Sequence, residues 1–194
     1  MGQDAAESGR RLQEVYGISG LQTSALFSIS EGSHLAFTNL EVRESRFDSM
    51  VYAERSTIAF DGIQVYNNSA AVLFDLAFSE ADFNNVQVGR NIGQLVLASS
   101  SELAVDDSLF TENQGGVKLS RSELQIEGSK YLGNLGFSLS SSALVIGDSM
   151  IHDTGGVLIE AAEKSAVRLE ETEVLGSLAA ENVMQIRSGS SMYF

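Results

Sequence analysis

Residues 101–121 read SELAVDDSLFTENQGGVKLSR, and residues 122–141 continue as SELQIEGSKYLGNLGFSLSS. The second segment repeats the pattern of the first, and this repetition decides the fold. Segments of the same kind begin at seven serines spaced 20 to 23 residues apart: Ser33, Ser56, Ser79, Ser101, Ser122, Ser142 and Ser165. Self-similarity at a fixed period of this length is typical of a solenoid, in which each repeat forms one turn of a stack.

Apolar and polar residues alternate within each repeat, which indicates strands rather than helices. In the segment at 101–121, Leu103 and Val105 share one face of a first strand. Phe110 lies in a second strand, and Val117 with Leu119 in a third. Three short strands and three turns describe one coil of a parallel β-helix, whose strands pair with the next coil at about 4.8 Å. We expect a right-handed coil because β-crossovers strongly prefer that hand.

The sequence therefore predicts an all-β fold, a single-stranded right-handed parallel β-helix of about 7–8 coils with 20–25 residues in each. We expect the solenoid to cover residues 17–194, after an N-terminal cap or flexible segment at 1–16. In three coils the expected inward residues of the third strand are Val72 with Phe74, Leu95 with Leu97, and Val157 with Ile159.

The last residues open a further coil, because Ser190 is followed by apolar residues at the two inward positions, Met192 and Phe194. An open coil exposes apolar surface and unpaired strand edges. We therefore expect the chain to be a piece of a longer β-helix, or a neighbouring β-helix chain to cover this end. Met192, Tyr193 and Phe194 are the candidate interaction end.

Composition narrows the range of partners. The 194 residues carry a formal net charge of −14, with a pI near 4.4, and include no cysteine, proline or tryptophan. An acidic chain is repelled by phosphate backbones and anionic lipids, so we expect neither nucleic-acid binding nor membrane insertion by this segment. Without cysteine there is no disulfide, thiol nucleophile or thiolate metal site.

One polar column falls in register on four consecutive repeats: Asn68, Asn91, Asn113 and Asn134. Stacked amides at a corner of a β-helix can hydrogen-bond along its axis and satisfy backbone groups of the turns. We interpret these asparagines as a structural ladder rather than as a catalytic site.

Two acidic columns are also in register. Glu80, Glu102 and Glu123 each follow an anchoring serine, and we expect them at a solvated edge. Because like charges this close repel one another, calcium is an alternative occupant and the one candidate cofactor. Paired carboxylates are what glycosidases require, so a second column of Asp107, Asp148 and Glu171 is the candidate catalytic set of a polysaccharide-active enzyme.

Phe110-Thr111-Glu112-Asn113, followed by Gly115-Gly116-Val117, resembles the F-x-x-N and G-G-[AILV] repeats of polymorphic outer-membrane proteins and related autotransporter passengers. Looser copies extend the resemblance over about residues 33–189. It implies a surface-exposed right-handed β-helix used in adhesion or as a stalk, and hence an extracellular or cell-surface location. The β-barrel of that family is missing from this sequence.

The favoured functional prediction is a non-enzymatic structural or adhesive segment of a larger surface or assembly protein, with a protein or a glycan as its partner. One alternative is a polysaccharide lyase or hydrolase that uses the second carboxylate column. The other is an assembly subunit that stacks end to end through open coils.

Overall fold

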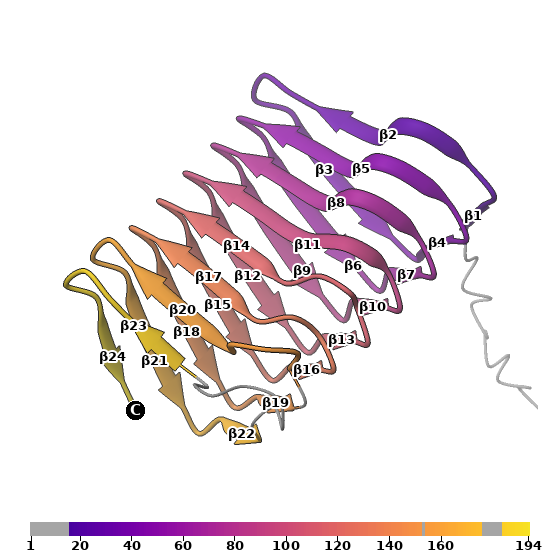
Figure 1. The fold of residues 1–194 in the computed structure, drawn as a ribbon. Helices are drawn as coiled ribbons and strands as arrows, with labels where there is room; N and C mark the ends of the chain where they lie inside the picture. Colours follow the sequence, from indigo (N-terminus) through magenta and orange to yellow (C-terminus); the bar gives the residue numbers. More distant parts are fainter. Residues whose placement is uncertain (1–15, 153, 176–183) are drawn as a thin grey trace, which may run out of the picture.

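The computed structural model has the predicted solenoid architecture (Figure 1), and it describes residues 16–152, 154–175 and 184–194. Within these ranges the chain forms 24 strands and no helix, and every strand pairing is parallel. The chain visits three eight-stranded sheets in turn, so that each strand pairs with the strand three positions later. The predicted all-β, three-strand coil is therefore confirmed.

We name the three sheets A, B and C. Sheet A contains β1 Tyr16–Ser19, β4 Leu40–Arg43, β7 Gln64–Tyr66, β10 Gln87–Gly89, β13 Leu109–Thr111, β16 Lys130–Leu132, β19 Met150–His152 and β22 Glu173–Leu175. Sheet B contains β2 Gln22–Ile29, β5 Arg46–Glu54, β8 Ser69–Ala77, β11 Ile92–Ser99, β14 Val117–Ser120, β17 Phe137–Ser140, β20 Ile159–Ala162 and β23 Met184–Ile186. Sheet C contains β3 His34–Thr38, β6 Thr57–Asp61, β9 Glu80–Asn84, β12 Glu102–Asp106, β15 Glu123–Glu127, β18 Ala143–Gly147, β21 Ala166–Glu170 and β24 Ser191–Tyr193.

Strand β1 begins at Tyr16, one residue before the predicted start of the solenoid. The rest of the predicted N-terminal segment, residues 1–15, lies outside the described residues.

Tight corners join the sheets, and residues with a left-handed backbone make them. The corner between sheets C and A has Asn39, Gly62, Asn85, Asp107, Gly128, Asp148 and Glu171 at this position. The corner between A and B has Glu44, Asn67, Arg90, Glu112 and Gly133, and the corner between B and C has Arg55, Phe78, Ser100, Arg121, Ser141 and Lys164. A left-handed residue bends the chain sharply from one sheet into the next, which keeps the corner short.

The interior of the coil is a stack of apolar side chains. Residues two, four and nine positions after the serines at 56, 79, 101, 122 and 142 are all buried, as predicted: Ile58, Phe60, Val65, Ala81, Phe83, Val88, Leu103, Val105, Phe110, Leu124, Ile126, Tyr131, Leu144, Ile146 and Ile151. Each apolar side chain packs on its counterparts in neighbouring coils, so burial is shared along the stack.

In three coils one member of the predicted inward pair of the third strand was wrong: Val72, Leu97 and Val157 are only half-buried, whereas Phe74, Leu95 and Ile159 are buried as predicted. The buried pairs there are Phe74 with Leu76, Val96 with Ala98, and Ile159 with Ala161. Two consecutive residues, Leu73-Phe74 and Leu95-Val96, are both buried, and this breaks the alternation on which the prediction relied. Strands β2, β5, β8 and β11 are also eight or nine residues long rather than short, and β11 contains an irregularity between Ile92 and Gln94.

Candidate functional site

The four predicted ladder asparagines are buried at the corner between sheets A and B. Each Nδ2 donates to a backbone carbonyl of the preceding coil, and the Nδ2 atoms of Asn68, Asn91 and Asn113 also donate to the Oδ1 of the next asparagine, all at 2.8–3.1 Å. The backbone N–H groups of Asn68, Asn91 and Asn113 donate to the same Oδ1 atoms at 2.9–3.0 Å. The Nδ2 and Oδ1 atoms of these buried side chains are therefore hydrogen-bonded within the protein. The asparagine column stabilises the corner between sheets A and B.

Two further ladders were not foreseen from the sequence. At the corner between sheets B and C, the backbone N–H of each serine donates to the Oγ of the next one at 3.0–3.2 Å, along Ser56, Ser79, Ser101, Ser122, Ser142, Ser165 and Ser190. At the corner between sheets C and A, Ser108, Ser129 and Ser149 do the same at 3.0 Å. The repetition of serine at one position of every coil was the signal that could have revealed the first of them.

The candidate catalytic carboxylates, Asp107, Asp148 and Glu171, are exposed corner residues between sheets C and A. All three have positive φ, at 48°, 43° and 46°. Gly128 stands between the first two, and a Cβ at that glycine would lie 2.8 Å from the Oδ1 of Asp107. The corner thus stacks acidic side chains along one outer edge of the solenoid.

Asp148 also interacts with Glu127, whose carboxylate lies over Gly147. A Cβ at Gly147 would lie 2.4 Å from the Oε2 of Glu127, so a side chain there would displace this carboxylate. Partial burial and the negative charge of Asp148 raise the pKa of Glu127 above its usual range, with smaller contributions from Asp106 and Glu170. The edge is therefore a column of mutually repelling carboxylates.

The predicted row of glutamates is in register on adjacent strands of sheet C, where Glu80 pairs with Glu102 and Glu102 with Glu123. Together with Asp82, Ala104 and Gln125 they line a shallow groove of about 350 Å³. Within the residues that the structure describes, no three His, Asp or Glu side chains come together as a metal site would require. The three candidate cation ligands are thus neighbours that face solvent along the sheet.

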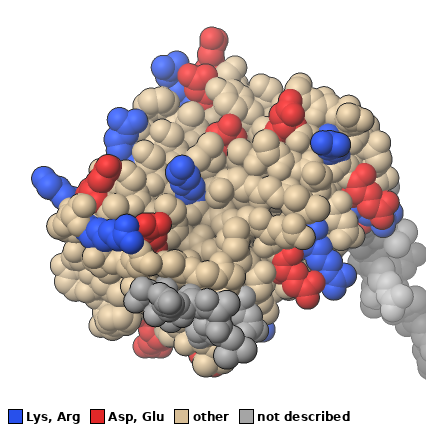
Figure 2. Space-filling model, in the orientation of Figure 1, with Lys and Arg blue, Asp and Glu red and all other residues tan. Residues whose placement is uncertain are grey.

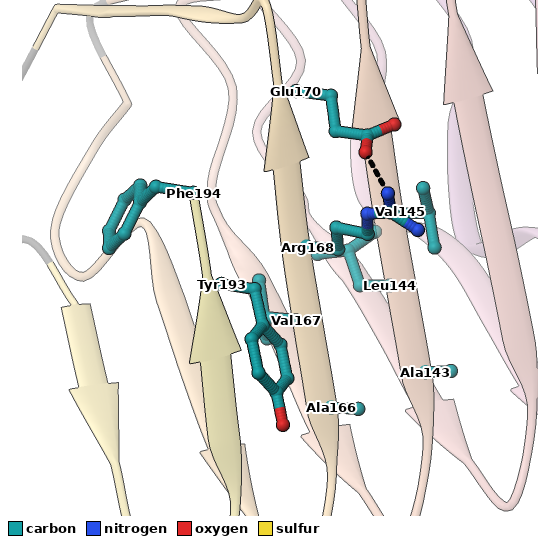
Figure 3. A pocket seen from close by; sticks show the side chains of 9 residues that line it. All are labelled: Ala143, Leu144, Val145, Ala166, Val167, Arg168, Glu170, Tyr193 and Phe194. Atoms are coloured by element: carbon teal, nitrogen blue, oxygen red, sulfur yellow. Dashed lines mark ion pairs between the residues drawn. The ribbon is translucent and has the colours of Figure 1, made fainter.

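A second groove, of about 520 Å³, lies on sheet C beyond the glutamate row (Figure 3). Ala143 and Ala166 lie at one end, and Arg168 forms an ion pair with Glu170 at the other. Tyr193 and Phe194, two of the three candidate interaction residues, complete the lining, whereas Met192 is half-buried against the core. The lining of this groove is mostly apolar, with Arg168 and Glu170 as its charged members.

The side of the solenoid formed by sheet B differs from sheet C in charge. Figure 2 shows the side on which sheet B lies nearest the viewer, where acidic and basic side chains are mixed and much of the surface is uncharged. On the strands of sheet C, by contrast, the outward positions contain eight carboxylates and one basic residue, Arg168. The eight are Asp61, Glu80, Asp82, Glu102, Asp106, Glu123, Glu127 and Glu170.

The described part of the chain contains no helix that is long and apolar enough to cross a membrane. Comparison with curated proteins gives no match. Two solved structures of QnrB1, described as a plasmid-mediated fluoroquinolone resistance protein, are similar at low level. A trypsin-treated variant is 12% identical with a TM-score of 0.29, covering 89% of this chain and 92% of its own. The full-length protein is 14% identical with a TM-score of 0.30, covering 90% and 93%. Likeness at these scores carries no functional inference.

A family model described as a right-handed β-helix region matches residues 25–177. The match covers most of the sequence, and its description agrees with the parallel three-sheet coil and its stacked corners. The chain belongs to the right-handed β-helix family.

Proposed function

We propose that this chain is a non-catalytic β-helical scaffold of a larger surface or assembly protein, and that it contacts a partner through its outer surface. The proposal rests on the burial of the polar residues that recur at the corners of successive coils. Those at the corners are buried in three hydrogen-bonded ladders and hold the coil together, so the repeat itself maintains a stiff rod. Residues free to contact a partner are those on the outer faces, where successive coils differ.

The positions of the candidate catalytic carboxylates also support a scaffold. Asp107, Asp148 and Glu171 occupy the left-handed corner position that Asn39, Gly62 and Asn85 occupy in earlier coils. Aspartate tolerates this backbone conformation better than most residues, which gives the two aspartates a reason to be there besides chemistry. Lysines and arginines that would hold an anionic polysaccharide are rare on sheet C, where Arg168 alone faces outward among eight carboxylates.

The location in this proposal is extracellular or at the cell surface. It rests on the resemblance of the Phe110–Asn113 and Gly115–Val117 motifs to autotransporter passengers, for which stalk and adhesion roles are expected.

A turnover assay tests the scaffold proposal. The protein would be incubated with a panel of neutral and acidic polysaccharides, with and without calcium, and the release of reducing and unsaturated sugars measured. We expect no release above that of an Asp107→Asn, Asp148→Asn, Glu171→Gln variant. Release that the Asp148→Ala substitution abolishes would contradict the proposal and favour the polysaccharide-active alternative.

A further inference from the structure

The apolar groove on sheet C exists because its outward side chains become small. The column that contains Glu80, Glu102 and Glu123 continues in register as Ala143 and then Ala166. The neighbouring column continues from Gln125 to Val145, Arg168 and Tyr193. Ala143, Val145 and Ala166 are small side chains, and they lie beside Tyr193, which is 61% exposed. Together these residues leave an apolar hollow in an otherwise polar surface. Exposed apolar hollows with a polar rim are typical of sites that contact a partner.

Glu123 pairs directly with Ala143, so the glutamate row leads into the apolar groove without a gap. A partner that lies along the solenoid axis on sheet C therefore passes over carboxylates before it reaches the hollow. The summed field of one-signed charge repels anionic partners and attracts cationic ones, and it raises their rate of association.

The spacing of the coils suits an extended peptide. Adjacent strands are about 4.8 Å apart, so the three glutamate rungs span about 10 Å along the axis. An extended chain places alternate side chains on one face about 6.8 Å apart, so two basic side chains at positions i and i+2 fit over the row. The next side chain of that face, at i+4, then reaches the groove floored by Ala143 and Ala166.

The groove is less suited to a sugar. The charged groups that could bind hydroxyls, Arg168 and Glu170, are engaged with each other in an ion pair (Figure 3). The apolar floor offers no hydrogen-bonding side chain at Ala143, Val145 or Ala166. A sugar that displaced the ion pair would leave charges without their partner, and this opposes binding.

We infer that the outer face of sheet C is a docking surface for an extended, cationic peptide segment of a partner protein. Its basic side chains lie over Glu80, Glu102 and Glu123, and an apolar side chain four residues after the first basic one enters the groove floored by Ala143 and Ala166. This inference rests on the proposed scaffold function, because it assigns a partner class to the outer surface of that scaffold.

Fluorescence anisotropy with designed peptides tests the inference. The probe is a fluorescein-labelled Lys-Ser-Lys-Ser-Leu-Ser peptide, and its matched comparison is Glu-Ser-Glu-Ser-Leu-Ser. Chitotetraose and cellotetraose are added as competitors. We expect saturable binding of the cationic peptide alone, weakened as sodium chloride rises because salt screens exposed charges, and no competition by either sugar.

Two pairs of variants separate charge from shape. Glu102→Gln with Glu123→Gln removes two charges of the row, and Glu44→Gln with Asp48→Asn removes two exposed charges elsewhere. Ala166→Tyr fills the groove, and Ala71→Tyr adds the same ring at an exposed position of β8. We expect each sheet C variant to weaken binding by about tenfold or more and each control by less than about twofold. Thermal melting of all four variants verifies that they are folded.

Equal binding of the cationic and anionic peptides, equal losses in sheet C and control variants, or competition by a tetrasaccharide would each overturn the inference. These outcomes are distinct from failure of the scaffold proposal, which the release of sugar products would show independently of peptide binding.

Discussion

Two parts of the solenoid fill the same interior cross-section with different side chains. In the earlier coils, the aromatic rings stack along sheet C, with ring centroids of Phe37 and Phe60 5.2 Å apart and those of Phe60 and Phe83 4.8 Å apart. In the later coils the rings lie along sheet A, where Phe110 and Tyr131 occupy the column that contained Val65 and Val88. Aromatic volume thus moves from one wall of the coil to another.

The core column at the start of sheet B also changes between the earlier and the later coils. The residues that precede the paired positions of sheet B are Met50, Leu73, Leu95, Gly116, Gly136 and Leu158 along successive coils. The two glycines coincide with Phe110 and Tyr131, so a large side chain on sheet A accompanies a missing one at the start of sheet B. In the coil at 101–121 the F-x-x-N and G-G motifs correspond to this combination, with Phe110 on sheet A and Gly116 at the start of sheet B.

The side chains of the earlier and later coils do not fill the core completely where these two parts of the solenoid meet. A small void of about 20 Å³ lies there, and its lining includes Phe83, Val105, Phe110 and Ile126. Protein interiors are normally packed to the density of organic crystals, so a void marks the position where the core can still accept atoms. One backbone repeat therefore tolerates two core solutions, and a small void lies where they meet.

Truncation of Phe110 is expected to have the largest effect. Phe110→Ala removes the ring that replaces the missing leucine volume, and it enlarges the existing void. A cost of about 3–5 kcal/mol in the free energy of unfolding is expected from comparable core truncations, measured by denaturant titration. Phe78→Ala, which removes a ring that is 56% exposed, is the control and should cost far less. Equal costs would show that Phe110 does not fill the later core.

The asparagine ladder runs through the earlier and the later coils with the same hydrogen bonds. Asn91→Ala therefore tests a structural feature that both parts of the solenoid have in common. The substitution leaves the backbone N–H of Asn68 and the carbonyl of Val65 without their amide partner in the interior. Each buried group left unpaired costs about 1–3 kcal/mol. We expect a clear drop in the melting temperature, whereas Asn84→Ala at an exposed position of sheet C leaves it nearly unchanged. A melting temperature of Asn91→Ala equal to that of the control would refute the ladder's structural role.

A methyl group at Gly116 tests why the later coils contain glycine. A Cβ there would lie 2.2 Å from the carbonyl oxygen of Gly136, so the neighbouring coil would have to shift. Overpacking of this kind costs about 1–3 kcal/mol. Gly17→Ala in β1, where nothing lies within 4 Å of the added atom, is the matched control. Urea unfolding should separate the two variants, and indistinguishable midpoints would contradict the close approach of the coils.

One substitution should have opposite signs in the two parts. Val105→Ile places an extra methylene into the void, which stabilises by about 0.8 kcal/mol if the group is buried without strain. Val65→Ile adds the same atoms to a fully buried position of the earlier coils and costs about 1–3 kcal/mol through overpacking. Differential scanning calorimetry of both variants checks the signs. Destabilisation by both would mean that the junction is packed as tightly as the rest.

The smallest predicted effect is on the pH dependence of folding stability. The raised pKa of Glu127 means that the folded chain holds its proton at pH values where the unfolded chain has lost it. Stability therefore falls as pH rises from the usual glutamate range through the raised value. Glu127→Gln should reduce this fall and slightly raise the melting temperature at pH 7, whereas Glu44→Gln should not. Parallel pH profiles of the variant and the parent would argue against this carboxylate pair.

The fold could be predicted because the repeat places apolar residues at fixed intervals, and alternation distinguishes strands from helices. The prediction failed at Val72, Leu97 and Val157, where two consecutive buried residues in the coil, or a glycine turn before it, shift the inward register. The asparagine ladder was predictable because an amide recurs at one position. The serine ladders were as regular, but serine is common at turns and its repetition was interpreted as an anchor.

The candidate site was less accessible to sequence reasoning. The groove on sheet C exists because Ala143 and Ala166 have small side chains. It also needs the ring of Tyr193, which comes from β24, one coil after Ala166 and two coils after Ala143. No motif marks such a hollow, since it arises only when three coils lie side by side. The position of Asp148 beside Glu127 likewise depends on the room above Gly147.

We propose that the buried ladders maintain the rod and that the outer face of sheet C binds the partner, so stability and binding should depend on different residues. The most direct test measures melting temperature and binding of the Lys-Ser-Lys-Ser-Leu-Ser peptide together for Asn91→Ala and Ala166→Tyr, at a temperature where both are folded. The account predicts that Asn91→Ala melts at a lower temperature and binds within about twofold of the parent, whereas Ala166→Tyr keeps its melting temperature and binds about tenfold more weakly or worse. Loss of stability and binding together in either variant would contradict it.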